Sequence, residues 1–241
     1  MRIIKVNSVE EMGKKAASLV SSQIILKPNS VVGLATGSTP LGMYKELINL
    51  YNKKEIDFNL VKTFNLDEYF GIEKENHQSY YYYMMNNFFK FIDILEENIN
   101  IPDGSAKDVV EECLRYERSI KQAGGIDIQV LGIGKNGHIG FNEPDVNFEA
   151  QTHLVELEES TIQANSIYFK TIEEVPTTAI SMGIKTIMNS RRIVLLANGY
   201  SKADAIYGTI NGKINPNLPA SILQLHPDVT LIIDKEAASK L

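Results

Sequence analysis

Short apolar runs alternate with amphipathic segments along the whole chain. Seven short segments have the alternating or continuously apolar pattern of strands: 2–6, 31–35, 61–66, 126–133, 153–158, 192–197 and 229–234. Between them, apolar residues at helical spacing predict helices, the clearest over 9–25, 41–53, 107–122 and 160–170. Strands that alternate with helices predict an α/β protein, with a Rossmann-like three-layer fold around a mostly parallel central sheet.

Local signals place several of the helix ends. Ser8 and Glu11 form a capping box at the start of the first helix. Pro40 stands where a first helical turn tolerates proline, and Gly124 with Gly125 ends the helix before the central apolar run. Segment 79–89 is rich in Tyr, Phe and Met. We interpret it as a helix packed on the sheet, because it lacks the basic residues that accompany aromatic nucleic-acid platforms.

Length and charge restrict the class of protein. The 241 residues are 44% hydrophobic and 22% charged, which predicts one domain, 1–241, with a full core. The net charge of −6 argues against a nucleic-acid partner, whose binding sites are usually basic. An anionic small molecule stays possible, because loops and helix ends bind phosphate even in acidic proteins.

The compartment is predicted from what the sequence lacks. Cys113 is the single cysteine, so no internal disulfide can form and a reducing compartment fits best. Its helical, charged surroundings favour a half-buried structural residue over a nucleophile. The first six residues are too charged for a signal peptide, and no apolar stretch reaches membrane-spanning length. We therefore expect a cytoplasmic protein with no membrane partner.

The segment 131–144 is the strongest candidate for a functional loop. It follows an apolar run, contains four glycines, and carries Asn136, His138 and Glu143. A buried strand that ends in a glycine-rich loop is where open α/β sheets place their ligands. An imidazole can take and return protons near neutral pH, and the three side chains could form one hydrogen-bonded line. The alternative is a glycine-rich turn with a structural histidine.

Two further segments are candidates for ligand contacts. Residues 36–40, Thr-Gly-Ser-Thr-Pro, link a predicted strand to a helix, an arrangement that directs N–H groups at an anion; a plain capped turn is equally compatible. They match neither a P-loop nor a dinucleotide fingerprint. Lys202 lies in a first helical turn, where the helix dipole disfavours a cation, which hints at an anionic ligand.

Asp67 follows the predicted strand 61–66 directly. A carboxylate at the carboxyl end of a sheet strand is well placed to act on a ligand in the crevice. A solvated carboxylate in a turn explains the residue equally well from the sequence.

Four motifs in this order resemble the glucosamine-6-phosphate deaminase family: Gly-Leu-Ala-Thr-Gly-Ser-Thr-Pro (33–40), Asn-Leu-Asp-Glu-Tyr (65–69), Gly-Lys-Asn-Gly-His-Ile-Gly-Phe-Asn-Glu-Pro (134–144) and Pro-Ala-Ser-Ile-Leu-Gln-Leu-His (219–226). The resemblance extends from the first strand to the end of the chain. It implies conversion of an amino-sugar phosphate, glucosamine 6-phosphate, with water to fructose 6-phosphate and ammonia. It also implies that no metal or organic cofactor takes part.

The resemblance also implies roles for individual residues. His138 would move a proton between the anomeric hydroxyl and the ring oxygen, and Glu143 would orient its imidazole. Asn136 stands where some family members have Asp; it could orient His138 but lacks the carboxylate's charge. Asp67 would carry the proton from C2 to C1 through an enolamine. The 6-phosphate would be held by Thr36, Gly37, Ser38 and Lys202.

Two departures from the family pattern are expected to matter. Ile167 occupies the position of a phosphate-binding arginine. Lys170, three residues later on the same predicted helix face, could compensate; the alternatives are that the protein prefers another amino-sugar phosphate or is a weak enzyme. The chain ends at Leu241 without the extension of longer, allosterically regulated relatives, so we expect no activation by N-acetylglucosamine 6-phosphate.

Other functions stay open at this point. A galactosamine-6-phosphate deaminase or isomerase is hard to separate by sequence. A 6-phosphogluconolactonase-type hydrolase shares the fold and a Gly-His loop, although segments 65–69 and 141–144 favour the deaminase. A sugar-phosphate-sensing protein without activity would need a DNA-binding domain that this chain has no room for. The sequence leaves undecided whether the chain is a monomer or a homo-oligomer.

Overall fold

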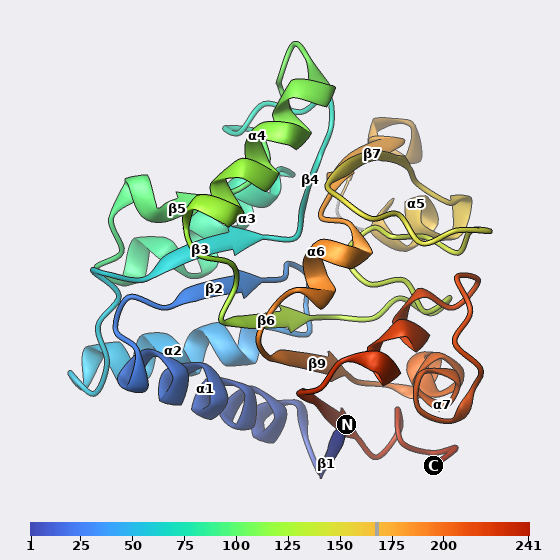
Figure 1. Cartoon of the computed structure of the whole chain (residues 1–241), viewed down its shortest axis with the longest axis horizontal. Coiled ribbons are helices and arrows are strands. Elements are labelled where there is room, and N and C mark those ends of the chain that lie inside the picture. Colours follow the sequence, from blue (N-terminus) through green and yellow to red (C-terminus); the bar gives the residue numbers. More distant parts are fainter. Residues whose placement is uncertain (167–168) are drawn as a thin grey trace.

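A seven-stranded sheet forms the centre of the protein in the computed structural model, which describes residues 1–166 and 169–241 (Figure 1). The strand order is β1-β10-β9-β6-β2-β3-β5, and every pairing is parallel. The bounds are β1 Arg2–Val6, β2 Val31–Leu34, β3 Lys62–Asn65, β5 Ile99–Asn100, β6 Ile128–Leu131, β9 Ile193–Ala197 and β10 Val229–Asp234. The predicted α/β fold with a mostly parallel sheet is confirmed.

Helices cover both faces of this sheet, as a three-layer fold requires. Apolar residues of α1, α2 and α3 pack on one face, and residues of α4, α6 and α7 pack on the other. The helices are α1 Val9–Leu26, α2 Leu41–Asn52, α3 Tyr80–Asn87, α4 Val109–Gln122, α5 Glu159–Asn165, α6 Ile184–Met188 and α7 Ala203–Asn211. Short 3₁₀ helices are η1 Phe89–Phe91, η2 Glu96–Asn98, η4 Ile172–Glu174, η5 Tyr200–Lys202 and η6 Pro219–Leu225.

A second, antiparallel sheet of three strands lies beside the first. Its order is β4-β8-β7, with β4 Asp67–Tyr69, β8 Thr178–Ser181 and β7 His153–Glu156. The strand predicted over 153–158 is therefore present but shorter. Strands β4, β5 and β8 and helix α6 were not predicted, because segments of two to five residues are too short to show a clear periodicity.

Leu66 joins the two sheets. Its N–H donates to the Leu34 carbonyl in β2, while its own carbonyl accepts from the Met182 N–H just after β8. The next residue, Asp67, then pairs with Ser181 of β8. The chain after β3 is thus not a solvated turn; the second sheet holds it against the edge of the first.

Local helix signals are largely confirmed. Ser8 Oγ accepts from the Glu11 N–H at 3.2 Å, but the Glu11 carboxylate accepts from the Asn7 N–H at 2.8 Å, one residue before the expected partner. Gly124 and Gly125 both have positive φ, as the end of α4 requires. The predicted helix 160–170 is wrong at its end, since α5 ends at Asn165.

Two smaller expectations can be compared with the structure. Cys113 is buried on α4, and burial raises the pKa of its thiol to about 11, which suits a structural residue rather than a nucleophile. No helix among residues 1–166 and 169–241 is long and apolar enough to cross a membrane.

Candidate active site

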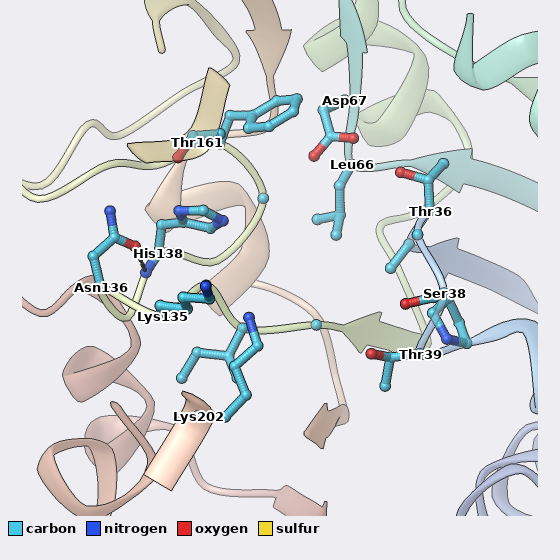
Figure 2. Close-up of a pocket in the computed structure, with 18 of the residues that line it drawn as sticks. Thr36, Ser38, Thr39, Leu66, Asp67, Lys135, Asn136, His138, Thr161 and Lys202 are labelled. Carbon is cyan, nitrogen blue, oxygen red and sulfur yellow. Dashed lines mark hydrogen bonds between the residues drawn. The ribbon is translucent and has the colours of Figure 1, made fainter. Parts of the chain in front are cut away.

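A pocket of about 530 Å³ lies at the carboxyl ends of β2 and β6 (Figure 2). The chain runs from β2 outward through β3 to β5, then returns to β6 and continues in the opposite direction to β9 and β10. The sheet therefore reverses its order between β2 and β6, which is where open α/β sheets bind their ligands. Loop 35–40 after β2 and loop 132–141 after β6 line most of the pocket, confirming that these two candidate loops meet.

Glycines shape the loop that carries His138. Gly137 and Gly140 have positive φ, a backbone conformation that other residues rarely adopt. The Gly134 N–H donates to the His138 carbonyl, and a Cβ on Gly134 would lie about 2.5 Å from the imidazole ring. The His138 ring therefore rests directly on the Gly134 backbone, and only glycine leaves room for it.

Glu143 is the acceptor on which the catalytic candidates converge. Its Oε2 accepts from His138 Nδ1 at 3.0 Å and from Asn136 Nδ2 at 2.8 Å, and its Oε1 accepts from Thr161 Oγ1 at 2.5 Å. Burial opposes ionisation, but the hydrogen bond and charge attraction of His138 outweigh it and hold the Glu143 pKa below its usual value. Glu143 is thus an ionised carboxylate that fixes one side of the imidazole.

This contact decides which ring nitrogen of His138 faces the pocket. An ionised carboxylate can only accept hydrogen bonds, so Nδ1 carries the hydrogen that is shared with Glu143. Nε2 is then left with its lone pair for the ligand. Figure 2 shows the His138 ring and the Asp67 carboxylate extending into the same space from opposite sides.

Asn136 belongs to this hydrogen-bonded group, but the three side chains do not form the single line that the sequence suggested. Its amide nitrogen donates to Glu143 and also to Glu158 Oε2, at 3.0 Å. Its amide oxygen accepts from the backbone N–H of His138 at 3.2 Å. Asn136 therefore orients His138 through Glu143 and through the backbone, without contacting the imidazole itself.

Asp67 is buried at the edge of the pocket. Burial, and second the charge of the neighbouring Glu68, raise its pKa from 3.8 to about 8. Its carboxylate forms no hydrogen bond or ion pair with any residue in the described ranges. An unpaired, desolvated carboxyl of this kind can exchange a proton with a ligand near neutral pH, and the interpretation of Asp67 as a solvated turn residue is wrong.

Glu68 is a residue of the site region that sequence analysis did not single out. It is 2% exposed, and its carboxylate accepts from the N–H groups of Tyr69, Tyr80 and Tyr81 at 2.8–2.9 Å. Burial nevertheless raises its pKa to about 7. Glu68 thereby links the first turn of α3 to β4, the strand that carries Asp67. This link holds Tyr80 in the wall of the pocket.

Another part of the pocket wall is suited to an anion. Thr36, Gly37 and Ser38 line it, and their backbone N–H groups donate to no residue of the described chain. Gly37 has positive φ, and its carbonyl is turned away to accept from Tyr83 Oη at 2.6 Å. Both hydroxyls, on Thr36 and Ser38, point into the pocket in Figure 2. Free N–H groups and hydroxyls at the start of α2 match phosphate oxygens.

Two lysines line the pocket across from this loop. Lys202 in η5 lies just before α7, and burial, followed by the positive charge of Lys135, lowers its pKa. Lys135 lies in the glycine-rich loop and lines the same pocket. Lys202 was predicted from its position; Lys135 was missed, because its neighbours in the sequence give no sign that it meets a residue 67 positions later.

Other predictions about the site differ from the structure or fall outside it. Ile167 lies outside the described residues. Lys170 is exposed and lies beyond α5, which ends at Asn165, so the prediction that Lys170 is part of this helix is wrong. Thr161, whose hydroxyl donates to Glu143, was also missed, because its place in the first turn of a predicted helix gives no sign of a partner 18 residues earlier. Among residues 1–166 and 169–241, no group of three or more His, Cys, Asp or Glu could hold a metal ion.

Comparison with known proteins gives one consistent family. The family model described as "Glucosamine-6-phosphate isomerases/6-phosphogluconolactonase" matches residues 5–232. Proteins named glucosamine-6-phosphate deaminase from Clostridium acetobutylicum and from Clostridium botulinum strain Langeland are 65% and 64% identical over 241 residues, covering all of this chain and 100% and 99% of theirs.

Solved structures agree with this. One, described as a monomeric glucosamine-6-phosphate deaminase, is 46% identical, with a TM-score of 0.98 and full coverage of both chains. A 6-phosphogluconolactonase from Trypanosoma cruzi has a TM-score of 0.78 at 20% identity, covering 100% of this chain and 96% of its own. The latter likeness shows the shared fold alone.

Proposed function

Because the chain belongs to the glucosamine-6-phosphate isomerase/6-phosphogluconolactonase family, we propose that it converts glucosamine 6-phosphate and water to fructose 6-phosphate and ammonia. One observation carries the proposal. A single pocket holds a buried, unpaired carboxyl, Asp67, opposite an oriented imidazole, His138, and its wall also contains an anion-binding loop and two lysines. Relatives that are 64–65% identical over the full chain are named glucosamine-6-phosphate deaminase, which supports the proposal.

Ring opening is the first step that the site supports. The lone pair on His138 Nε2 takes the proton of the anomeric hydroxyl and returns it to the ring oxygen, so that the C1–O5 bond breaks and an aldehyde forms. The ionised Glu143 stabilises the imidazolium that exists between the two transfers. Asn136 and Thr161 hold Glu143 in place from either side, as supporting groups do for catalytic histidines.

Proton transfer between neighbouring carbons is the second step. Ionised Asp67 removes the proton from C2, and the C1 oxygen takes a proton from the substrate's own ammonium group, which gives a neutral enolamine. Asp67 then delivers its proton to C1, which leaves a protonated imine at C2. Water adds to this imine, and ammonia departs as fructose 6-phosphate forms. One carboxylate serves both carbons because they are adjacent. The raised pKa of Asp67 supports this role, since a base must also be able to give the proton back.

The phosphate fixes the sugar between these groups. The N–H groups and hydroxyls of loop 36–38 and the cation of Lys202 would hold the 6-phosphate at the far end of the pocket. The six-carbon chain would then extend toward Asp67 and His138. The roles predicted for the site residues are compatible with this arrangement.

Direct assays separate the proposal from its alternatives. Ammonia release is measured with glucosamine 6-phosphate and galactosamine 6-phosphate in parallel, and acid release is measured with 6-phosphogluconolactone. We expect ammonia from glucosamine 6-phosphate with the largest kcat/KM of the three. Faster turnover of the lactone or of the galactosamine ester would overturn the assignment, and turnover of none of the three would favour a sensor.

The whole of 1–241 is proposed to act as one domain, which the family match over 5–232 supports. A cytoplasmic location remains a prediction that rests on the sequence, with its single cysteine. The oligomeric state is open, although one structural relative is described as monomeric.

The pH dependence follows from the raised pKa of Asp67. The base is active only when ionised, so kcat/KM is expected to rise with pH up to about 8. Glu68→Gln removes the neighbouring negative charge, which lowers the pKa of Asp67. The rise of kcat/KM with pH, the acid limb of the profile, then occurs at lower pH. The displacement is smaller than the whole shift, because burial, the larger cause, remains.

The Glu68→Gln enzyme provides a second readout. A glutamine keeps one acceptor oxygen but loses the other, so at least one N–H among Tyr69, Tyr80 and Tyr81 is left unpaired. A buried unpaired donor costs about 1–3 kcal/mol of stability, which thermal unfolding measures. An acid limb that stays in place in a folded variant would show that Glu68 does not influence the catalytic carboxyl.

A further inference from the structure

The cationic end of the pocket contains two ammonium groups rather than one. Lys135 and Lys202 come from different loops, after β6 and after β9, and Figure 2 shows both amines directed into the pocket. The pKa of Lys202 is lowered, first by burial and second by repulsion from the positive charge of Lys135. Two cations that approach each other destabilise the empty site unless an anion is bound between them.

No carboxylate compensates these charges. Neither lysine forms a salt bridge with any residue in 1–166 or 169–241. Among the described residues that line the pocket, Asp67 is the single acidic one, and it lies at the other end. This absence is notable in a chain of net charge −6, where carboxylates outnumber cations. The positive charge is therefore available to a ligand.

A phosphate monoester matches this arrangement. It has a charge of about −1.5 to −2 at neutral pH and three oxygens that accept strong hydrogen bonds. The N–H groups and hydroxyls of loop 36–38 lie on the side of the pocket opposite the two lysines. Neutral donors on one side and two cations on the other would surround a dianion and neutralise it.

We propose that Lys135 is a substrate-binding residue that, together with Lys202, clamps the phosphate of the substrate between two ammonium groups. The inference rests on the proposed function for the identity of the substrate, but not for the presence of an anion site.

The test measures phosphate binding without relying on turnover. Binding of inorganic phosphate is measured by isothermal titration calorimetry for the wild type, Lys135→Gln, Lys135→Arg and Lys107→Gln. Lys107→Gln is the matched control, because it removes the same charge from an exposed residue outside the pocket. We expect Lys135→Gln to weaken phosphate binding by about tenfold or more, the usual effect of losing a charge-assisted hydrogen bond. Lys135→Arg retains most of the affinity, and Lys107→Gln matches the wild type.

Kinetics with glucosamine 6-phosphate give the second measurement. Lys135→Gln should raise KM by a similar factor while kcat falls by less, as expected when binding of ground state and transition state is weakened alike. Increasing salt should raise the wild-type KM more steeply than that of the variant, because fewer charges remain to be screened.

The outcomes separate the inference from the proposed function. Lys135-dependent phosphate binding in a chain that releases no ammonia would support the clamp and reject the deaminase. Ammonia release with an unchanged KM and unchanged phosphate affinity in a folded Lys135→Gln variant would support the deaminase and overturn the clamp. A wild-type chain that binds no inorganic phosphate would also overturn the clamp.

Discussion

Asp67→Asn is expected to lower kcat by about 10²-fold or more while KM stays nearly unchanged, since general-base catalysis contributes at least that much. Asparagine keeps the shape of the side chain but cannot accept the C2 proton. The measurement is ammonia release from glucosamine 6-phosphate under saturating conditions. Asp57→Asn, at an exposed position outside the pocket, is the control and should behave as the wild type.

The same variant should gain stability as its activity is lost. The folded protein retains a proton on Asp67 up to about pH 8, whereas the unfolded chain releases it near pH 4. Stability from this group is therefore fully present below about pH 4 and lost as pH rises through about 8. An asparagine does not titrate, so the variant should melt above the wild type at pH 8. A variant that keeps more than about a tenth of wild-type kcat would exclude Asp67 as the base.

His138→Gln is expected to impair the cyclic substrate far more than the chemistry at C1 and C2. Ring opening requires a group that takes and returns a proton, and glutamine does neither; loss of such a group typically costs about 10²–10⁴-fold. Proton exchange at C1 of fructose 6-phosphate in the presence of ammonia, followed by NMR in D₂O, reports on Asp67 without requiring closure of the glucosamine ring. We expect this exchange to continue in His138→Gln while ammonia release from glucosamine 6-phosphate is nearly abolished.

Two variants make the result specific. Asp67→Asn should lose the exchange, which shows that the readout follows the base. His77→Gln, an exposed histidine outside the pocket, should leave both measurements unchanged. Equal loss of exchange and of ammonia release in His138→Gln would mean that the histidine takes part in the carbon chemistry, and the ring-opening role would be withdrawn.

Most of the main fold could be predicted because its signals are local. Apolar runs gave the strands of the parallel sheet to within two residues at either end, apart from the two-residue β5. Caps and glycines placed the ends of α1 and α4, since the relevant hydrogen bonds join residues close in sequence. The second sheet was only partly predicted. Its strands β4 and β8 have three and four residues and are held by partners about 110 positions apart.

The sequence by itself determined which side chains stand in the two glycine-rich loops. His138, Glu143 and Gly37 could be placed in these loops from the sequence. The glycines that bend each loop stand in the same short motif as these residues. The order of strands and helices then placed both loops at the carboxyl ends of parallel strands. Asn136, His138 and Glu143 could therefore be predicted from the sequence alone as one group, whereas Thr161 could not.

Only the tertiary structure decided how strongly each group is perturbed. Asp67 could be a solvated or a buried carboxyl until β8 paired with β4, and its pKa depends on the water excluded there. Thr161 reaches Glu143 across 18 residues, and Lys135 meets Lys202 across 67. Desolvation and charge–charge repulsion depend on distances in space, and segments far apart in the sequence acquire those distances only when the two sheets and their loops are packed together.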